Sequence, residues 1–330
     1  MRTLILYFGL AAAGYLIGKR KKVKSVLTSR IQTAALYTLV GVMGLRMGMN
    51  EEIIGQIGSI GISAFVFTIV VMAFSALFVR ISRLAMNIDR YAVPGGNGDP
   101  AAATRAAGEE ASQESGDESR KTTIAILFFL ALGMTSGVLL SNLTAVSGTG
   151  FEVSVIDSVT GDIITLGLCA LLMMVGIDMG AEGSMLENLR KAGLRVFVTP
   201  VAVILGTFAG SLLMSLFLPI SAKECLAVGA GFGWYSLAPG ILMENGFALA
   251  GAISFLHNVM REVFSIAAIP FVAEKIGYIE CVSLPGACAG DVCLPVVQRS
   301  AGSRTAIYSV FSGGTLSIAV PLLVTMIVSL

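Results

Sequence analysis

Apolar runs long enough to span a membrane follow one another along almost the whole chain, separated by short polar stretches. A helix needs about twenty apolar residues to cross the hydrocarbon core of a bilayer. By this measure the pattern predicts ten membrane segments, near residues 3–18, 27–48, 56–80, 122–141, 160–180, 194–217, 224–243, 248–274, 283–298 and 305–329. The chain is therefore predicted to be an all-α polytopic membrane protein. The ninth segment is short and interrupted, so either a crossing or a re-entrant loop fits it.

Composition agrees with a membrane protein and narrows the possible partners. Of the 330 residues, 55% are hydrophobic and 13% are charged, whereas a soluble domain carries about 25% charged residues. The net charge of +1 gives no reason to expect nucleic acid as a partner. Five cysteines, an odd number, predict no disulfide framework. Cys288 and Cys293 with His257 match no established metal-ligand spacing, so we expect neither a metal nor a cofactor.

The distribution of basic residues predicts how the chain is oriented. Loops rich in Lys and Arg stay on the cytoplasmic side of a membrane, whereas acidic residues have little influence. With the N-terminus outside, most basic residues fall inside, and the outside loops hold only Arg2, Lys223 and Lys275. Arg299 and Arg304 then favour a crossing by the ninth segment, because a crossing puts them inside. This prediction leaves both termini outside.

A polar stretch divides the chain into two parts. Residues 92–121 are rich in Gly, Ala, Ser and Glu, which predicts a flexible cytoplasmic linker. This linker separates an N-terminal bundle of three spans, residues 1–91, from a transport domain at residues 122–330.

A short motif recurs on the two sides of this linker. The second segment ends with Gly44-Leu-Arg46-Met-Gly48, and the fifth ends with Gly176-Ile-Asp178-Met-Gly180. An interval of three spans is odd, so the copies must have opposite topology, which is typical of inverted-repeat transporters. Gly-rich membrane helices can also repeat such a motif by chance. Simple alternation runs the seventh and ninth segments in the same direction, so they form an inverted pair only if one is re-entrant or the repeats are permuted.

Two segments contain too much Gly and Pro for an undistorted helix. The first break is predicted near 229–240, where Gly231, Gly233, Trp234, Tyr235 and Ser236 fall together. The second is predicted near 283–298, between Pro285 and Pro295. Unwound backbone is tolerated at membrane depth where it lines a cavity or packs within protein, and such breaks hold ions or zwitterions in carriers. The alternative is that the glycines serve close helix packing and the Trp marks a membrane interface.

The eighth segment carries Arg261 and Glu262 near its middle. An ionisable group at that depth costs at least about 2.5 kcal/mol and usually serves transport. Asn258, Glu262 and Ser265 are spaced by four and three residues, so they share one helical face, with Arg261 and His257 along a neighbouring stripe. A carboxylate there could bind a substrate ammonium group and release it on taking a proton. The alternative is that Arg261 and Glu262 pair with other residues and hold the bundle together.

Other acids are candidates of different strength. Asp291 lies in the second break, where it is either a second buried acid of the site or the N-cap of a helix. Asp178 and Glu244 are weaker candidates because they lie close to segment ends. His257 is expected to be a satisfied polar group rather than a proton relay.

Three motifs carry a resemblance to a known family. The string Gly231-Phe-Gly-Trp-Tyr-Ser236, the Arg261-Glu262 pair and the Gly290-Asp291 break together resemble the LysO lysine exporter family, most strongly from about 160 to 329. The resemblance implies a multi-pass carrier of the cytoplasmic (inner) membrane that expels L-lysine and toxic lysine analogues in exchange for protons. The acids of that family correspond here to Glu262 and Asp291. The chain is also distantly similar to cation:proton antiporters and bile-acid-type symporters.

Two other functions compete with this interpretation. The first is a sodium or other cation:proton antiporter of the same fold, in which the acids bind only the ion. The second is an intramembrane aspartyl protease, which Gly290-Asp291 and Leu294-Pro295 faintly resemble. Cys288 replaces a glycine of that protease motif, and the nearest second acid, Asp178, lies at a segment end. No phosphate-binding loop is found, so transport should be driven by an ion gradient.

Overall fold

The structure, a computed structural model, describes residues 2–20, 25–91, 114–147, 153–182 and 194–330, and these residues form helices with no β-strand. The elements are α1 (Arg2–Arg20), α2 (Ser25–Met49), α3 (Glu51–Gly55), α4 (Ile57–Ala85), α6 (Glu114–Ser147), α7 (Val153–Glu182), η1 (Leu194–Phe197), α9 (Val198–Met214), α10 (Ala222–Gly229), α11 (Ala238–Glu244), α12 (Ala248–Lys275), α13 (Tyr278–Ser283), η2 (Gly286–Gly290) and α14 (Leu294–Ser329). The all-α prediction is thus confirmed. Helix α6 begins at Glu114, inside the predicted linker, and the rest of that linker, 92–113, lies outside the described residues.

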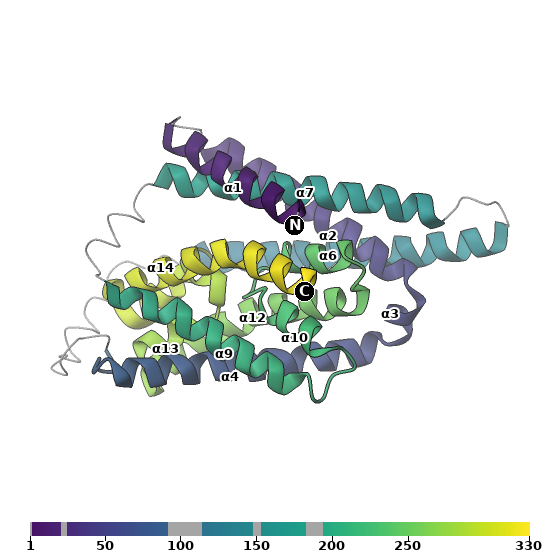
Figure 1. Ribbon diagram of the computed structural model, residues 1–330. Coiled ribbons are helices and arrows are strands. Elements are labelled where there is room, and N and C mark those ends of the chain that lie inside the picture. The colour runs from purple at the N-terminus through teal and green to yellow at the C-terminus, as the bar shows by residue number, and fades with distance from the viewer. Residues whose placement is uncertain (1, 21–24, 92–113, 148–152, 183–193) are drawn as a thin grey trace.

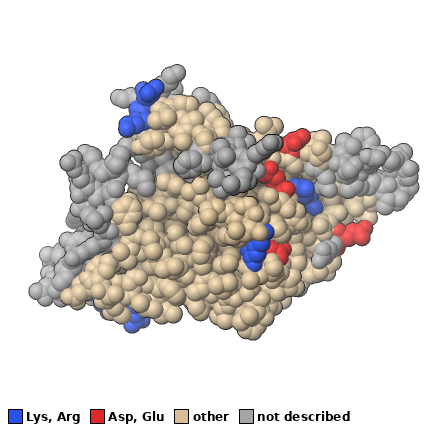
Figure 2. Space-filling model, viewed as in Figure 1, with Lys and Arg blue, Asp and Glu red and all other residues tan. Residues whose placement is uncertain are grey.

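The outer surface is that of a membrane protein. Among the described residues, five helical stretches are long and apolar enough to cross a bilayer, namely Ile57–Ala85, Ile124–Leu143, Ser158–Ile177, Ala248–Lys275 and Thr305–Ser329. Large apolar side chains point outward along these helices, as Ile62 and Phe128 do with 69% and 61% of their surface exposed. Figure 2 shows a face on which charged side chains occupy only small patches. Such an exterior is stable only against lipid.

The helices form two groups (Figure 1). In the four-helix layer, α1 packs against α7, and α2 packs against α6 and α7. In the core group, α4 packs against α9 and α12, and α10, α11, α13 and α14 surround α12. The three long N-terminal helices, α1, α2 and α4, therefore each pack mainly against helices from beyond residue 113. In space, residues 1–91 do not form the separate bundle that the sequence suggested.

Close contact between glycines explains this pairing. A Cβ added to Gly48 of α2 would lie 2.1 Å from the carbonyl oxygen of Met134, and one added to Gly137 of α6 would lie 2.2 Å from that of Leu45. On α7, a Cβ at Gly180 would lie 2.2 Å from the carbonyl oxygen of Tyr15 in α1. Small residues let membrane helices approach until their backbones touch. Both copies of the repeated motif thus end in a glycine at a helix crossing.

The polypeptide reverses direction within the predicted seventh segment. Helices α10 and α11 have 8 and 7 residues, and each is only about 12 Å long, too short to cross a 30 Å hydrocarbon core. The Lys223 Nζ, at the start of α10, lies 5.4 Å from the centroid of the Phe247 ring, just after α11. Both ends of this segment therefore lie at the same end of the molecule. We call α10, α11 and the residues between them hairpin 1.

Because hairpin 1 turns back, α12 runs parallel to α4. The Thr68 Oγ1 of α4 lies 2.9 Å from the His257 Nδ1 of α12, and after both helices have ended the Tyr278 N–H donates to the Arg90 carbonyl at 2.8 Å. Lys275 thus lies at the same end of the molecule as Arg90. The prediction that Lys275 faces the opposite side was wrong, since it assumed that the seventh segment crosses. We call the end that holds Arg90 and Lys275 the basic end.

A second hairpin starts from the basic end. It consists of α13, η2 and the first turns of α14, and we call it hairpin 2. Helix α14 changes direction at Gly302, whose φ of 78° and ψ of 170° are not helical. Its long C-terminal part, yellow in Figure 1, then runs from the basic end toward the opposite end. Hairpin 2 therefore does not cross, contrary to the crossing favoured for the ninth segment. The two hairpins enter from opposite ends.

The glycine crossing of α2 and α6 can be tested by a matched pair of substitutions. Gly48→Ala should lower the free energy of unfolding by about 1–3 kcal/mol, because the added methyl group forces two backbones apart. Gly41→Ala, on the same helix, is the control, since a Cβ there meets nothing within 4 Å. The measurement is the thermal unfolding midpoint in detergent. Equal midpoints for the two variants would contradict the crossing.

The direction of α12 can be tested by labelling intact cells with a membrane-impermeant maleimide. Lys223→Cys and Lys275→Cys should react from opposite sides of the membrane, because hairpin 1 does not cross. Arg90→Cys should behave like Lys275→Cys. If both segments crossed the membrane, Lys223→Cys and Lys275→Cys would react from the same side. That result would show that hairpin 1 crosses and would contradict the direction of α12.

Candidate functional site

The two hairpins meet at their tips. The Ala287 N–H of hairpin 2 donates to the Phe232 carbonyl of hairpin 1 at 2.8 Å. The backbone is left-handed at Phe232, with φ of 44°, and at Gly286, with φ of 67°. A Cβ on Gly286 would lie 2.2 Å from the Phe232 carbonyl oxygen, so only glycine allows this contact. The contact joins segments that are more than fifty residues apart in the chain.

Helix α12 lies beside both tips, and Asn258 fastens it to hairpin 1. The Asn258 Oδ1 accepts a hydrogen bond from the Gly233 N–H at 2.7 Å, and its Nδ2 donates to the Ser254 carbonyl at 2.8 Å. A Cβ on Gly231 would lie 2.6 Å from the Asn258 Nδ2. Gly231 and Asn258, both predicted to belong to the site, therefore support its wall from behind.

A cavity of about 480 Å³ lies in front of these tips. This volume falls within the range of small-molecule sites, about 300–1,000 Å³. Hairpin 1 contributes Gly233, Trp234, Tyr235 and Ser236, and α12 contributes Glu262. The remaining wall comes from hairpin 2, from α2 and α7 of the four-helix layer, and from α14. The cavity thus lies between the two groups of helices.

The acid on α12 is enclosed by the cavity wall. Glu262 is 5% exposed, and the Cys288 thiol lies 3.5 Å from its Oε2. Nearby, the Trp234 Nε1 donates to the Ser236 Oγ at 3.0 Å, which fixes the indole ring at the cavity edge. A carboxylate held among aromatic and thiol groups, with few other partners, is suited to attract a cation.

The second acid, Asp291, lines the same cavity but is exposed rather than buried as predicted. It lies just after η2, where its Oδ1 accepts a hydrogen bond from the Val292 N–H at 2.6 Å. Nor is it a helix N-cap, because the N-cap position of α14 is Cys293. Asp291 is exposed because of the tertiary structure: hairpin 2 turns at this residue, which therefore faces the opening between the two groups of helices.

Arg261 points away from the cavity. It is fully buried, and its Nε donates to the Leu284 carbonyl at 2.9 Å while one Nη lies 3.3 Å from the Ser283 carbonyl and 3.4 Å from the Ser75 Oγ. These carbonyls are the unsatisfied C-terminal groups of the half-helix α13, where a cation is favourable. Arg261 therefore holds hairpin 2 against α12 and α4 and does not line the cavity.

The remaining predicted residues lie elsewhere. His257 faces α4, where its Nδ1 lies 2.9 Å from the Thr68 Oγ1 and its ring packs edge-on against Phe67. The Glu244 Oε1 accepts a hydrogen bond from Thr165 at 2.9 Å, outside the cavity. Asp178 belongs to α7, but its side chain lies outside the described residues.

Several residues that line the cavity were not predicted to belong to the site. Gln32 and Thr33 of α2 line it, as does Cys288. Gln32 and Thr33 could have been found in the sequence as polar residues within the second predicted membrane segment. Among the described residues no group of His, Cys, Asp and Glu side chains could hold a metal ion, so Cys288, Cys293 and His257 do not converge.

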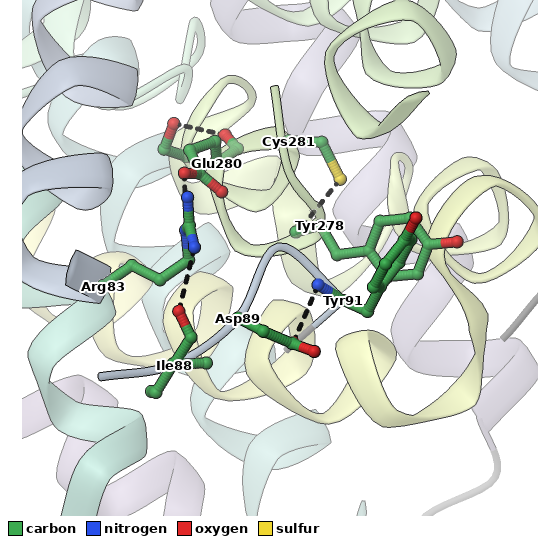
Figure 3. Close-up of polar contacts among 8 residues, drawn as sticks. Arg83, Ile88, Asp89, Tyr91, Tyr278, Glu280 and Cys281 are labelled. Atoms are coloured by element: carbon green, nitrogen blue, oxygen red, sulfur yellow. Dashed lines mark hydrogen bonds and ion pairs between the residues drawn. The ribbon is translucent and has the colours of Figure 1, made fainter. Parts of the chain in front are cut away.

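A buried ion pair at the basic end was also missed (Figure 3). The Arg83 Nε donates to the Glu280 Oε1 at 2.7 Å, and an Nη of Arg83 donates to the Ile88 carbonyl at 2.9 Å. The Tyr91 ring packs edge-on against Tyr278. These contacts fasten the base of hairpin 2 to α4. From the sequence, Glu280 and Arg83 are nearly 200 residues apart and resemble ordinary loop charges.

Fold and site together define a polytopic helical membrane protein with an acid-lined cavity in front of two hairpin tips. A family model described as "Lysine exporter LysO" matches residues 126–328, well over half of the chain. The chain therefore belongs to the LysO lysine exporter family, which confirms the resemblance seen in its motifs.

Two relatives agree with this membership. The Escherichia coli (strain K12) protein "Lysine exporter LysO" is 31% identical over 157 residues, which cover 48% of this chain and 52% of the relative. A Haemophilus influenzae (strain ATCC 51907 / DSM 11121 / KW20 / Rd) protein, whose name marks it as a provisional lysine exporter, is 29% identical over 158 residues, or 47% of this chain and 79% of the relative. The chain thus spans about half the length of the first relative. No solved structure matches it.

Proposed function

We propose that this protein is a secondary active exporter of L-lysine and toxic lysine analogues in the inner membrane, coupled to proton entry. The observation that carries the proposal is that Glu262 and Asp291 line one solute-sized cavity in front of the two hairpin tips. Carboxylates attract ammonium groups, and hairpin tips at membrane depth are where carriers bind their substrates. The names of two relatives, one given as a lysine exporter and the other provisionally so, support the choice of substrate.

In the proposed cycle, Glu262 binds an ammonium group of lysine while ionised and releases it when a proton arrives. The Trp234 and Tyr235 rings line the same cavity, and an ammonium group is attracted to the face of an aromatic ring. Protonation removes the attraction to the carboxylate, so one site exchanges a cation for a proton.

We further propose an inverted-repeat architecture. Helices α1, α2 and α4 would form one copy, and α6, α7 and α9 the other, with α1 on α7, α2 on α6 and α4 on α9 as corresponding contacts. Hairpin 1 followed by α12, and hairpin 2 followed by the long part of α14, would form a second inverted pair. The full-length helices would then cross the membrane while the two hairpins re-enter it, with the basic end in the cytoplasm.

Under this orientation the cavity is loaded from the cytoplasm. Gln32 and Leu36 line it near the start of α2, and Leu171 and Val175 line it in the second half of α7, so it lies in the half of the molecule nearer to the basic end. An exporter collects its substrate from that side. A cation:proton antiporter is the competing function, because two carboxylates and freed backbone carbonyls also suit Na⁺.

The central prediction concerns Glu262. In proteoliposomes with an imposed pH gradient, wild-type protein should move labelled lysine, and Glu262→Gln should lose at least about 90% of that flux, since an amide carries no charge and takes no proton. Glu274→Gln, an exposed acid on the same helix and outside the cavity, is the control and should retain flux. Normal flux by folded Glu262→Gln would remove the proposed mechanism. Sodium flux without lysine flux in the wild type would favour the cation antiporter.

The role of Asp291 is tested separately. Asp291→Asn should raise the KM for lysine several-fold at unchanged expression, because the second carboxylate lies at the cavity wall and contributes to attracting the cation. The measurement is the concentration dependence of initial flux at fixed pH. Wild-type kinetics would reduce Asp291 to a residue that shapes the turn after η2.

A further inference from the structure

A second cavity, of about 220 Å³, lies at the end of the molecule opposite to the basic end. Its wall is formed by the end of α2, by α3, by the end of hairpin 1 and by the start of α12. The residues that line it are Arg46, Met47, Met49, Asn50, Ile53, Met243, Gly246 and Ala248. Like the first cavity, it lies where α2 of the four-helix layer faces the core group.

Helix α11 separates the two cavities. A Cβ on Gly240 would lie 3.2 Å from the Leu168 Cδ2, so α11 packs directly on α7. One turn further along α11, the Glu244 Oε1 accepts the hydrogen bond from Thr165. On α7, these contacts lie nearer to the N-terminal end than Leu171, which lines the first cavity. A half-helix of 7 residues therefore closes the path from the first cavity to the second.

The cavities differ in charge. Among the described residues, the charged side chains that line the first are Glu262 and Asp291, both acidic. Of the described residues that line the second, Arg46 alone is charged. A guanidinium group is the preferred partner of a carboxylate in proteins because its fork of N–H donors matches the two oxygens. An amino acid with a cationic side chain carries groups suited to both cavities.

The repeated motif gives a second reason to assign Arg46 a role. Its glycines account for the helix crossings, and these contacts need only small residues. The central position of the motif is Arg46 in one copy and Asp178 in the other. Packing does not explain why the central residue of the motif is charged in both copies.

We propose that the second cavity is a release site, in which Arg46 binds the carboxylate of the exported amino acid after α11 has moved away from α7. This inference rests on the proposed export of lysine and adds a second binding site to it. The substrate is held first by its ammonium groups at Glu262 and then by its carboxylate at Arg46.

The test uses two ligands that differ only in the carboxylate. Lysine and cadaverine share the same pair of amino groups, and cadaverine lacks the carboxylate. In right-side-out vesicles, each is added outside and its inhibition of labelled lysine counterflow is measured. External lysine should inhibit wild-type protein about ten- to hundredfold more strongly than cadaverine, as expected for hydrogen bonds to a charged group. Equal inhibition by the two ligands would overturn the proposal without any variant.

Variants at Arg46 sharpen the result. Arg46→Gln should weaken inhibition by external lysine about tenfold or more and leave cadaverine unchanged. Arg46→Lys, which keeps the charge, should restore part of the preference, and the KM for lysine on the cytoplasmic side should stay at the wild-type value in both variants. If Arg46→Gln weakened inhibition by lysine and by cadaverine equally, Arg46 would have only a structural role.

The two proposals fail in different ways. Absence of lysine counterflow in folded wild-type protein would refute lysine export itself. Normal counterflow with an unchanged response of Arg46→Gln to external lysine would refute only the release site.

Discussion

The hydrogen bond between the tips of the two hairpins is the contact on which the rest of the site depends. Backbone groups within a bilayer must find partners inside the protein, because no water is present to replace them. The Phe232 carbonyl, freed where hairpin 1 unwinds, accepts the Ala287 N–H of hairpin 2. Asn258 accepts the neighbouring Gly233 N–H, and Arg261 takes the carbonyls at the end of α13. Helix α12 thereby satisfies both breaks with two side chains one turn apart.

This arrangement explains why adjacent charged residues on α12 have different surroundings. Neighbouring residues on a helix point about 100° apart, so Arg261 faces hairpin 2 and α4 while Glu262 faces the cavity. The Arg261 guanidinium group donates to backbone carbonyl oxygens, while the Glu262 carboxylate faces the cavity in front of the tips. The buried Arg83–Glu280 pair also fastens hairpin 2 to the core group, because Arg83 belongs to α4 and Glu280 to α13 at the base of the hairpin. Ion pairs of this kind are expensive to break, because each leaves a buried charge behind.

The four-helix layer is held by a different principle. Its helices touch through glycines, so that the backbones of α1 and α7, and of α2 and α6, lie in contact. Between membrane helices the hydrophobic effect supplies no attraction, and close packing takes its place. By contrast the layer meets the core group around two cavities and through the contacts of α1 with α14 and of α11 with α7 and α2. Glu262 and Asp291 of the first cavity and Arg46 of the second lie along this boundary.

Much of the site could be read from the sequence because it follows from local composition. Clustered glycines and prolines destabilise a helix, so both breaks could be predicted, and an acid within an apolar run has few uses besides transport. The family motifs then fixed Gly233 to Ser236, Glu262 and Asp291 as one group. Gln32 and Thr33 were harder to find, because a polar residue in a membrane helix can equally satisfy a neighbouring helix.

The sequence by itself determined that the chain is helical, apolar outside and broken at two places, since these properties depend on hydrophobic length and backbone chemistry. Only the tertiary structure decided the direction of the segments. Hydropathy cannot tell a crossing from a hairpin when two short helices contain enough apolar residues for one span, so Lys275 was predicted at the wrong end. The same is true of Arg261, whose direction depends on carbonyls that hairpin 2 brings to it from more than twenty residues away.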